Sequence, residues 1–546
     1  MSWGELVGAA LLGAERRTPP GGSVGALLDA AAVETVRRRA GLRPAPAAPR
    51  PDPAPPDPRP PLPPAAARRL SLLLADRPGA GGGRRGTAPD LAELLPQWLA
   101  AACAHGYRAP AWQLPALLDA ARARTDLRAG ALALGGPRAL WLARLNPDWR
   151  YALRGRFGRG PVPPPDGVRG ADDADTADGA DGADGAVRRL WKEGLFAERS
   201  ALLLSLRRRD PAAARELLAG TWAEERAEDR LMFLDSLREG LSAQDEEFLE
   251  RALADRSRNV RSTAAELLSA LPSSALAARM AARARSCVAL DRTGRPDRLV
   301  VEAPYECDPG MRRDGVVPGA PPGRGERSWW LVQVVEAAPL DTWPEHLGGR
   351  TPDRIAALPV ADDWEADLHA AWARAAVRLR DTAWARALLR RPSAPMAAAP
   401  GDPAKLLALL PAPERARWAA EFTAAHGLSE AFRVLGVCEV PWAEPLGRAV
   451  VDALEIARDA GSYPWSFSGV LGLAERCLDP GEADRLAPLA AVPDEPEDGS
   501  PGAGGYWAEA FQRLVATLRL RATMLAELEP PGDAGPARGP AAAERV

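Results

Sequence analysis

Lysine, histidine and cysteine are scarce in this 546-residue chain, which has two lysines, four histidines and five cysteines. Neither Lys192 nor Lys405 follows a glycine-rich turn, so we expect no phosphate loop for a nucleotide. Cys103 and His105 form the one close Cys/His pair, and no second pair stands at zinc-finger spacing. The cysteines are odd in number and widely spread, which argues against a disulfide framework and favours a reducing compartment.

Long apolar runs are also missing, since no stretch approaches the roughly 18 residues of a membrane-spanning helix. The first residues lack the basic and apolar regions of a signal peptide, so we expect a cytoplasmic protein. The net charge of −3 gives no overall basic field of the kind that binds nucleic acid. The basic residues are nearly all arginine, which with abundant Ala, Gly and Pro indicates a GC-rich bacterial genome rather than a function.

The clearest positive signal lies between Asp245 and Pro272, where two apolar stripes of helical period flank a polar turn. The first stripe is Phe248, Leu249, Ala252 and Leu253, and the second is Val260, Ala264, Leu267, Leu268 and Leu271. A helix pair of this form is typical of a HEAT-type repeat, which buries its apolar face by stacking on neighbours. We expect Arg261 to pair with Asp255 across the turn, and Arg258 to be exposed.

Other segments have compositions that are incompatible with helices. Residues 44–64 contain twelve prolines, too many for a helix. Residues 161–186 repeat Asp and Gly, a spacing that can suggest a calcium site, but they lack the glutamate and the flanking helices of an EF-hand. Such segments bury no apolar surface, so we expect them to be exposed and poorly ordered.

The predicted fold class is all-α, with a HEAT-like helical-repeat array and flanking helical segments. In chain order we expect an N-terminal helical segment (1–43), a Pro-rich linker (44–64), a helical domain (65–160), an Asp/Gly-rich disordered linker (161–186), a HEAT-like array (187–290), an irregular loop insertion (291–327), a C-terminal helical domain (328–529) with a disordered break at 493–505, and a disordered tail (530–546).

The loop insertion is the main candidate for a functional surface. It contains the strand-like run Leu299-Val300-Val301 and then a segment whose prolines and glycines prevent regular structure. Long irregular loops in a helical protein are uncommon and often functional. The residues we expect to contact a partner are Glu302, Tyr305, Asp308, Met311, Arg312, Arg313, Asp314 and, in the array, Arg258. The alternative is that Arg313 and Asp314 pair with neighbouring helix ends and only pin the loop.

No pattern of catalytic residues stands out. His369 is the most suggestive histidine, but the carboxylates of residues 362–367 are more typical of the solvated first turn of a helix. The pairs Trp329-Trp330 and Trp364/Trp372 could be ligand platforms, although tryptophan at helical spacing is more often core. We therefore assign no catalytic residue, metal or cofactor.

Four blocks carry a family resemblance: Trp3–Arg17, Gly136–Trp149, Asp255–Pro272 and Pro304–Gly315. In these blocks the chain resembles DUF5691, a bacterial family of unknown function, and the Pro-rich and Asp/Gly-rich linkers look like additions to the common pattern. The resemblance implies a gene context with a MoxR-type AAA+ ATPase and a von Willebrand factor A (VWA) domain protein. It implies no activity.

Two function hypotheses remain. The first is a non-enzymatic scaffold that binds a protein partner through a helical face and the loop of residues 302–315, in the AAA+/VWA system that the resemblance implies. The second is a HEAT-like nucleic-acid binder or enzyme, against which the near-neutral charge counts. A continuous positive groove with a tryptophan would favour the second, and a mixed-sign surface with exposed apolar side chains the first.

The Val260→Asp substitution tests the repeat. If Val260 faces the core, a buried unpaired carboxylate should cost on the order of several kcal/mol and abolish cooperative folding of the array. Thermal denaturation followed by circular dichroism measures this. An unchanged midpoint would show that this face is not core.

Overall fold

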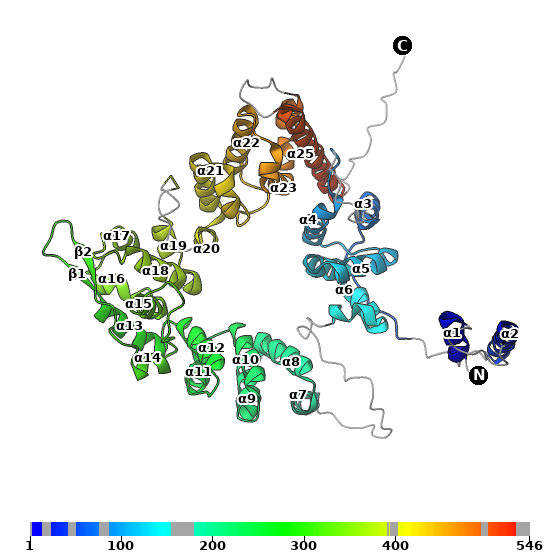
Figure 1. Ribbon diagram of the computed structural model, residues 1–546, viewed down its shortest axis with the longest axis horizontal. Helices are drawn as coiled ribbons and strands as arrows, with labels where there is room; N and C mark the ends of the chain where they lie inside the picture. Colours follow the sequence, from blue (N-terminus) through cyan, green and yellow to red (C-terminus); the bar gives the residue numbers. More distant parts are fainter. Residues whose placement is uncertain are drawn as a thin grey trace, which may run out of the picture. The chain divides into compact units, whose positions relative to one another are not determined.

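The computed structural model describes residues 3–13, 23–41, 51–75, 87–153, 179–389, 392–393, 402–492 and 501–530. The chain divides into two compact units, Met1–Pro55 and Pro56–Val546. The described residues are predominantly α-helical, with one two-stranded sheet, so the all-α prediction is confirmed (Figure 1). None of the helices in these ranges combines the length and apolar content needed to cross a bilayer.

The first unit is a helical hairpin of α1 (Trp3–Leu12) and α2 (Val24–Gly41). Among its described residues, Leu6, Ala9 and Leu27 are the buried cluster, with Ala30 packed against them.

The second unit begins with four helices and three short 3₁₀ turns, whose buried side chains form a main core and a smaller cluster at η3. The helices are α3 (Pro64–Ala75), α4 (Leu91–Ala104), α5 (Leu114–Ala123) and α6 (Arg128–Leu145), and the turns are η1 (Ala111–Gln113), η2 (Thr125–Leu127) and η3 (Pro147–Ala152). Asp90 caps α4 by accepting from the backbone amides of Ala92 and Glu93. Leu70, Leu99 and Leu117 are fully buried between the helices.

The end of the proline-rich segment lies against this domain, so the linker prediction for 44–64 is wrong in its last third. Arg59 pairs with Asp57 and donates to the carbonyls of Tyr107 (3.3 Å) and Ala133 (2.6 Å). The backbone amide of Leu62 donates to Arg108 O (3.1 Å). Arg59 therefore supplies hydrogen-bond donors to backbone carbonyls of the helical domain, and these bonds hold the proline-rich segment against it.

The repeat array follows. It comprises α7 (Gly179–Glu193), α8 (Phe196–Arg209), α9 (Pro211–Thr221), α10 (Ala227–Asp235), η4 (Ser236–Arg238), η5 (Ala243–Asp245), α11 (Glu246–Ala252), α12 (Arg258–Ser269) and α13 (Ala275–Cys287). The helix α7 starts inside the segment predicted as disordered, 161–186. Trp191 is buried and anchors the C-terminal part of this helix. Once that part has formed, each residue added at the N-terminal end gains one backbone hydrogen bond, so the helix extends into the segment.

The predicted helix pair is present as α11 and α12. Val260, Ala264 and Leu268 are fully buried, and Arg258 is exposed at the start of α12. The predicted pairing of Arg261 with the Asp255 carboxylate is wrong. Arg230, on α10, donates to Asp255 Oδ1 (3.1 Å), while Arg261 donates to the Asp255 backbone carbonyl (2.7 Å). The Asp255 carboxylate thus links the turn between α11 and α12 to the preceding helix α10, instead of pairing within its own helix pair.

A fully buried ion pair joins α8 to η5. Arg207 donates to both carboxylate oxygens of Asp245, at 3.0 and 2.9 Å, and neither side chain is exposed. The same guanidinium donates to the carbonyls of Glu239 (2.9 Å) and Gly240 (3.0 Å), where the chain turns after α10. Arg215 also donates to Asp245 Oδ1 (3.2 Å).

The predicted insertion 291–327 is more regular than expected. The strand β1 (Val288–Asp291) pairs antiparallel with β2 (Arg298–Val301), which includes the predicted run Leu299–Val301. Leu299 also bridges to Val360, so the hairpin is tied to a later segment. The short helix α14 (Pro309–Arg313) follows, and α15 (Glu326–Ala337) begins within the predicted loop.

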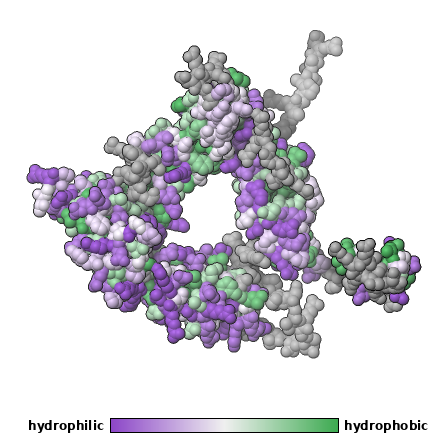
Figure 2. Space-filling model, in the orientation of Figure 1, coloured by the Kyte–Doolittle hydropathy of each residue, from purple (hydrophilic) through white to green (hydrophobic). Residues whose placement is uncertain are grey.

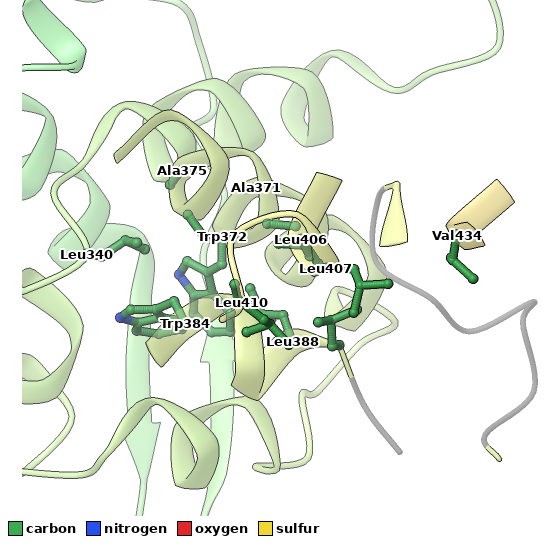
Figure 3. Close-up of a cluster of buried hydrophobic side chains, with 14 of the residues drawn as sticks. Leu340, Ala371, Trp372, Ala375, Trp384, Leu388, Leu406, Leu407, Leu410 and Val434 are labelled. Atoms are coloured by element: carbon green, nitrogen blue, oxygen red, sulfur yellow. The ribbon is translucent and has the colours of Figure 1, made fainter. Parts of the chain in front are cut away.

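The C-terminal helices complete the unit: α16 (Thr342–His346), α17 (Pro352–Ala356), α18 (Glu365–Leu379), α19 (Thr382–Leu388), α20 (Pro403–Leu407), α21 (Ala412–Leu435), α22 (Glu444–Asp459), η7 (Pro464–Phe467), α23 (Ser468–Cys477), η8 (Pro480–Glu482), α24 (Ala483–Leu486), η9 (Ala487–Ala490) and α25 (Ala503–Ala526). Figure 3 shows Trp372 and Trp384 pointing toward one another among leucines of α19 and α20, with ring centroids 5.3 Å apart. Trp372 is core, as predicted, and so is Trp330.

The last helix corrects the domain map. Met524 and Leu528, at the end of α25, belong to the core of α3–α6. Arg69 pairs with Glu527 (2.8 Å), and Gln97 donates to the carbonyl of Arg476 (2.7 Å). The predicted separate domains 65–160 and 328–529 therefore share a core. The helix α25 begins at Ala503, inside the predicted break, while 493–500 and 531–546 lie outside the described residues.

The Asp245→Ala substitution should destabilise the second unit by about 3–5 kcal/mol, because it leaves the Arg207 charge buried without its carboxylate. Urea denaturation measures the loss. Asp484→Ala is the matched control, since Asp484 pairs with Arg519 but is 91% exposed, and its loss should cost under about 0.5 kcal/mol. Equal effects of the two substitutions would contradict a structural role for the buried pair.

Candidate functional site

The loop from Glu302 to Asp308 connects β2 to α14. Its base is fixed, since the amide of Glu302 donates to the carbonyl of Cys287 (2.8 Å) and the side chains of Ala303 and Cys307 are buried. Asp308 caps α14 by accepting from the amide of Met311 (2.7 Å). Asp308 therefore shapes the end of the loop, in addition to any contact with a partner.

Two of the predicted partner-binding residues, Met311 and Asp314, are instead buried. Asp314 accepts from Arg279 (2.8 Å) and Arg283 (2.6 Å) of α13, so it holds α14 against the array. This is the arrangement that the alternative interpretation proposed for Asp314. Arg313 and Arg312 are exposed, and Arg312 donates to the carbonyl of Cys307 (3.1 Å).

Gly315 explains why glycine follows Asp314. Its φ is +93°, a left-handed conformation that suits glycine at the end of a helix. A Cβ at this position would stand 2.4 Å from the Cβ of Ala265 on α12. The Asp314-Gly315 pair therefore serves close packing of α14 on the array rather than exposure to a partner.

Tyr305 projects from this fixed base and is 75% exposed. The guanidinium of Arg327 lies over its ring, 4.3 Å from the centroid, and donates to the carbonyls of Ala303 (2.6 Å) and Pro304 (3.2 Å). Sequence reasoning missed Arg327, which stands on α15 and carries no local signal of this contact. The arginine holds both the loop backbone and the aromatic ring in one position.

A hollow of about 240 Å³ lies beside Tyr305. Its lining includes the carboxylate residues Glu302, Glu306 and Asp308, with Arg283 and buried Met311. The volume is below the ~300–1,000 Å³ usual for small-molecule sites, and suits one inserted side chain. We call Glu302, Tyr305, Glu306, Asp308 and Arg327 the Tyr305 surface.

The thiols next to this surface are poorly suited to nucleophilic chemistry. Burial raises the pKa of Cys287, which lines the hollow, and that of Cys307, so both are protonated at neutral pH. Among the described residues no group of three or more His, Cys, Asp or Glu side chains is arranged to hold a metal ion.

The remaining candidates lie elsewhere. Arg258 is exposed on α12 and is not among the described residues that line the hollow. His369 is buried against Trp372, with ring centroids 5.7 Å apart, so it belongs to the core. Asp367, predicted to be solvated, accepts from Ser328 Oγ (2.7 Å) and joins α18 to α15.

A larger hollow, of about 990 Å³, lies between α17, α19 and α21. Leu358, Leu410 and Trp418 give it apolar walls, and Arg386 and Glu414 face each other in a two-fold hydrogen-bonded pair at 2.6 and 2.7 Å. Asp353 and Glu365 also line this hollow.

The family model of DUF5691, a family of unknown function, matches residues 5–528. The chain belongs to the DUF5691 family. The matched range runs from α1 to the end of α25, so it includes most of both units and the residues of the Tyr305 surface. No curated protein and no solved structure matches this DUF5691 chain.

The stability that Asp314 provides should depend on pH. Burial alone would raise the pKa of Asp314, but hydrogen bonds and charge from Arg279 and Arg283 outweigh it and place that pKa below its ordinary value. A depressed folded-state pKa gives stability that is complete above the unfolded-state value, about 3.9, and is lost as pH falls through the folded-state value.

Asp314→Asn should therefore destabilise the protein by about 1.5–3 kcal/mol at neutral pH, and its difference from wild type should shrink below roughly pH 4. Urea denaturation at a series of pH values measures both. The neighbouring exposed residue supplies the control, because Arg313→Ala should leave stability unchanged. A difference that stays constant down to acidic pH would contradict the assignment to the carboxylate.

Proposed function

We propose that this DUF5691 protein is a non-enzymatic helical-repeat scaffold that binds a protein partner through the Tyr305 surface. The observation that carries the proposal is an aromatic side chain that is 75% exposed on a loop whose base is fixed. Tyrosine and arginine are enriched among the residues that dominate protein–protein binding energy. A ring already held by Arg327 loses little freedom on binding, so less of the contact energy is spent on ordering it.

The chemistry of the surface favours a basic partner. Glu302 and Glu306 are exposed beside Tyr305, and Asp308 is half-buried at the edge of the hollow. Two cations lie close to these carboxylates: Arg283 is already paired with Asp314 at 2.6 Å, and Arg327 donates to the carbonyls of Ala303 and Pro304. An acidic rim around a hollow of side-chain size suits an arginine or lysine of the partner, and opposite charges also raise the rate of association.

The same charges count against the alternative of a nucleic-acid binder. Non-specific binding of nucleic acid depends on lysine and arginine that neutralise phosphates, and carboxylates would repel them. In the array, several arginines on adjacent helices are committed to carboxylates, such as Arg230 to Asp255 and Arg238 to Glu266. These pairs leave fewer free cations for a phosphate backbone.

The partner that the family resemblance favours is a MoxR-type AAA+ ATPase or a VWA-domain protein. The stacked helices would hold one of these proteins, and the Tyr305 surface would bind a basic side chain of that partner.

Tyr305→Ala should weaken binding by about 2 kcal/mol, roughly thirtyfold, without changing the melting temperature. The tagged protein is first purified from its own host and its AAA+ and VWA companions identified by mass spectrometry. The affinity of the purified companion for wild type and variant is then measured by calorimetry. Trp112→Ala is the matched control, because Trp112 is 69% exposed on η1 and outside the Tyr305 surface.

Charge reversal tests the second element of the proposal. Glu302→Lys with Glu306→Lys should weaken binding, and more strongly at low salt, because it places like charges opposite the basic partner. Unchanged affinity in both the Tyr305 and the charge-reversal variants would overturn the proposed surface. Capture of nucleic acid in place of either companion would favour the alternative function.

A further inference from the structure

The segment Asp57–Leu62 lies on the surface of the α3–α6 domain like a bound peptide. Pro61 bridges to Arg108 in parallel register, and the amide of Arg108 donates to the carbonyl of Pro60 (2.9 Å). The segment and the domain both belong to the second unit, Pro56–Val546. An extended peptide that pairs its backbone with a chain already in place is a recurring mode of peptide recognition.

One arginine provides most of the polar contacts between this segment and the domain. The Arg59 guanidinium donates to the carbonyls of Tyr107 (3.3 Å) and Ala133 (2.6 Å) through one nitrogen. Its other edge donates to both carboxylate oxygens of Asp57, at 2.9 and 2.7 Å. The carbonyl of Arg59 in turn accepts from Arg108 Nε (2.7 Å). Asp57 therefore holds the guanidinium in the orientation in which its remaining donors reach the domain.

Gly136 leaves the space that this arginine occupies. Its φ is +56°, and it interrupts the helical conformation inside α6. A Cβ at this position would stand 2.1 Å from Arg59 Nη2 and 2.6 Å from Asp57 Oδ2. The break in α6 thus admits a guanidinium together with its carboxylate, which makes the site selective for an Asp-x-Arg sequence.

The segment can leave this site at small cost. Pro58, Pro60 and Pro61 are exposed, and proline has no amide hydrogen that would need a partner. A proline-rich chain stays extended and solvated when it is free, so release leaves its polar groups bonded to water. Leu62, which belongs to the domain core, marks the end of the part that can be released.

The same properties suit a peptide from another molecule. Because a proline-rich peptide is already extended, it loses little conformational entropy when it docks. Figure 2 shows a mixed hydrophilic and hydrophobic surface over α3–α6, as suits a site that binds its ligand largely through hydrogen bonds.

From these contacts we infer that the α3–α6 domain is a recognition site for an extended, proline-rich peptide of a partner that carries the sequence Asp-x-Arg-Pro. The chain's own residues Asp57–Pro60 are an exchangeable occupant of this site, and their contacts define the chemistry of the ligand. A partner peptide binds by displacing them, so the docked segment is an autoinhibitory contact. The inference is independent of the Tyr305 surface.

A labelled synthetic peptide of residues 51–61 tests the site, with fluorescence anisotropy against the full chain. Arg59→Ala in the chain removes the anchor of its own segment and leaves Gly136 and the backbone carbonyls of the site in place. The peptide should bind this variant at least about tenfold more tightly than wild type, in which the tethered segment competes at an effective concentration on the order of millimolar. The same peptide with Arg59→Ala should not bind. Arg144→Ala is the matched control in the chain, because Arg144 is exposed on α6 and its loss leaves the segment docked.

Hydrogen exchange of the wild-type chain keeps the inference falsifiable if the Arg59→Ala chain is poorly folded. The amide of Arg108 donates to the carbonyl of Pro60, so it should exchange at least about tenfold faster than the interior amides of α4. Equal rates would show that the segment opens only when the domain unfolds, and would overturn the inference.

Three further results would also overturn it. The first is no binding of the peptide to a folded Arg59→Ala chain, and the second is equal binding to that chain and to wild type. The third is a wild-type dimer that becomes a monomer in Arg59→Ala, which would assign the site to the segment of a second copy. Light scattering of both chains measures the last.

Discussion

Arginine side chains that reach from one helix to the end of another hold this structure together. Arg207 is fully buried on Asp245 and the carbonyls after α10, and Arg415 donates to the carbonyls of Val437 (2.6 Å) and Leu410 (3.0 Å). Arg521, near the end of α25, does the same for the carbonyl of Leu478 (2.6 Å). Helix ends leave carbonyls without intrahelical donors, and the planar guanidinium has five donors to supply them. A stack of short helices has many such ends, so it depends on these contacts.

Arginine contacts of the same kind position the Tyr305 surface. Asp314 on Arg279 and Arg283 holds α14 to the array, and Arg327 on two loop carbonyls holds the segment before it. Between these two anchors Cys307 and Met311 are buried in the core, whereas the Tyr305 side chain projects outward. Fixed backbone and exposed aromatic therefore arise together, which is the combination that a binding surface requires.

Sequence reasoning succeeded where the physics is local. The stripe of Val260, Ala264 and Leu268 requires only helical period, and it predicted burial correctly. It failed where a partner comes from far along the chain. The Asp255 carboxylate accepts from Arg230 rather than from Arg261. Asp314, predicted either to contact a partner or to pin the loop, accepts from two arginines of α13. The residues next to Asp255 and Asp314 in the sequence do not indicate these arginines, because both contacts depend on how neighbouring helices stack.

The sequence by itself determined the all-α class, the repeat of α11 and α12, and the position of the loop, because apolar period and proline content act within a few residues. Only the tertiary structure decided that Arg59 docks the proline-rich segment and that α25 completes the core of α3–α6. It also decided which loop residues are buried and which project. These contacts join residues tens to hundreds of positions apart. Packing selects them, and packing depends on the whole fold rather than on any local pattern.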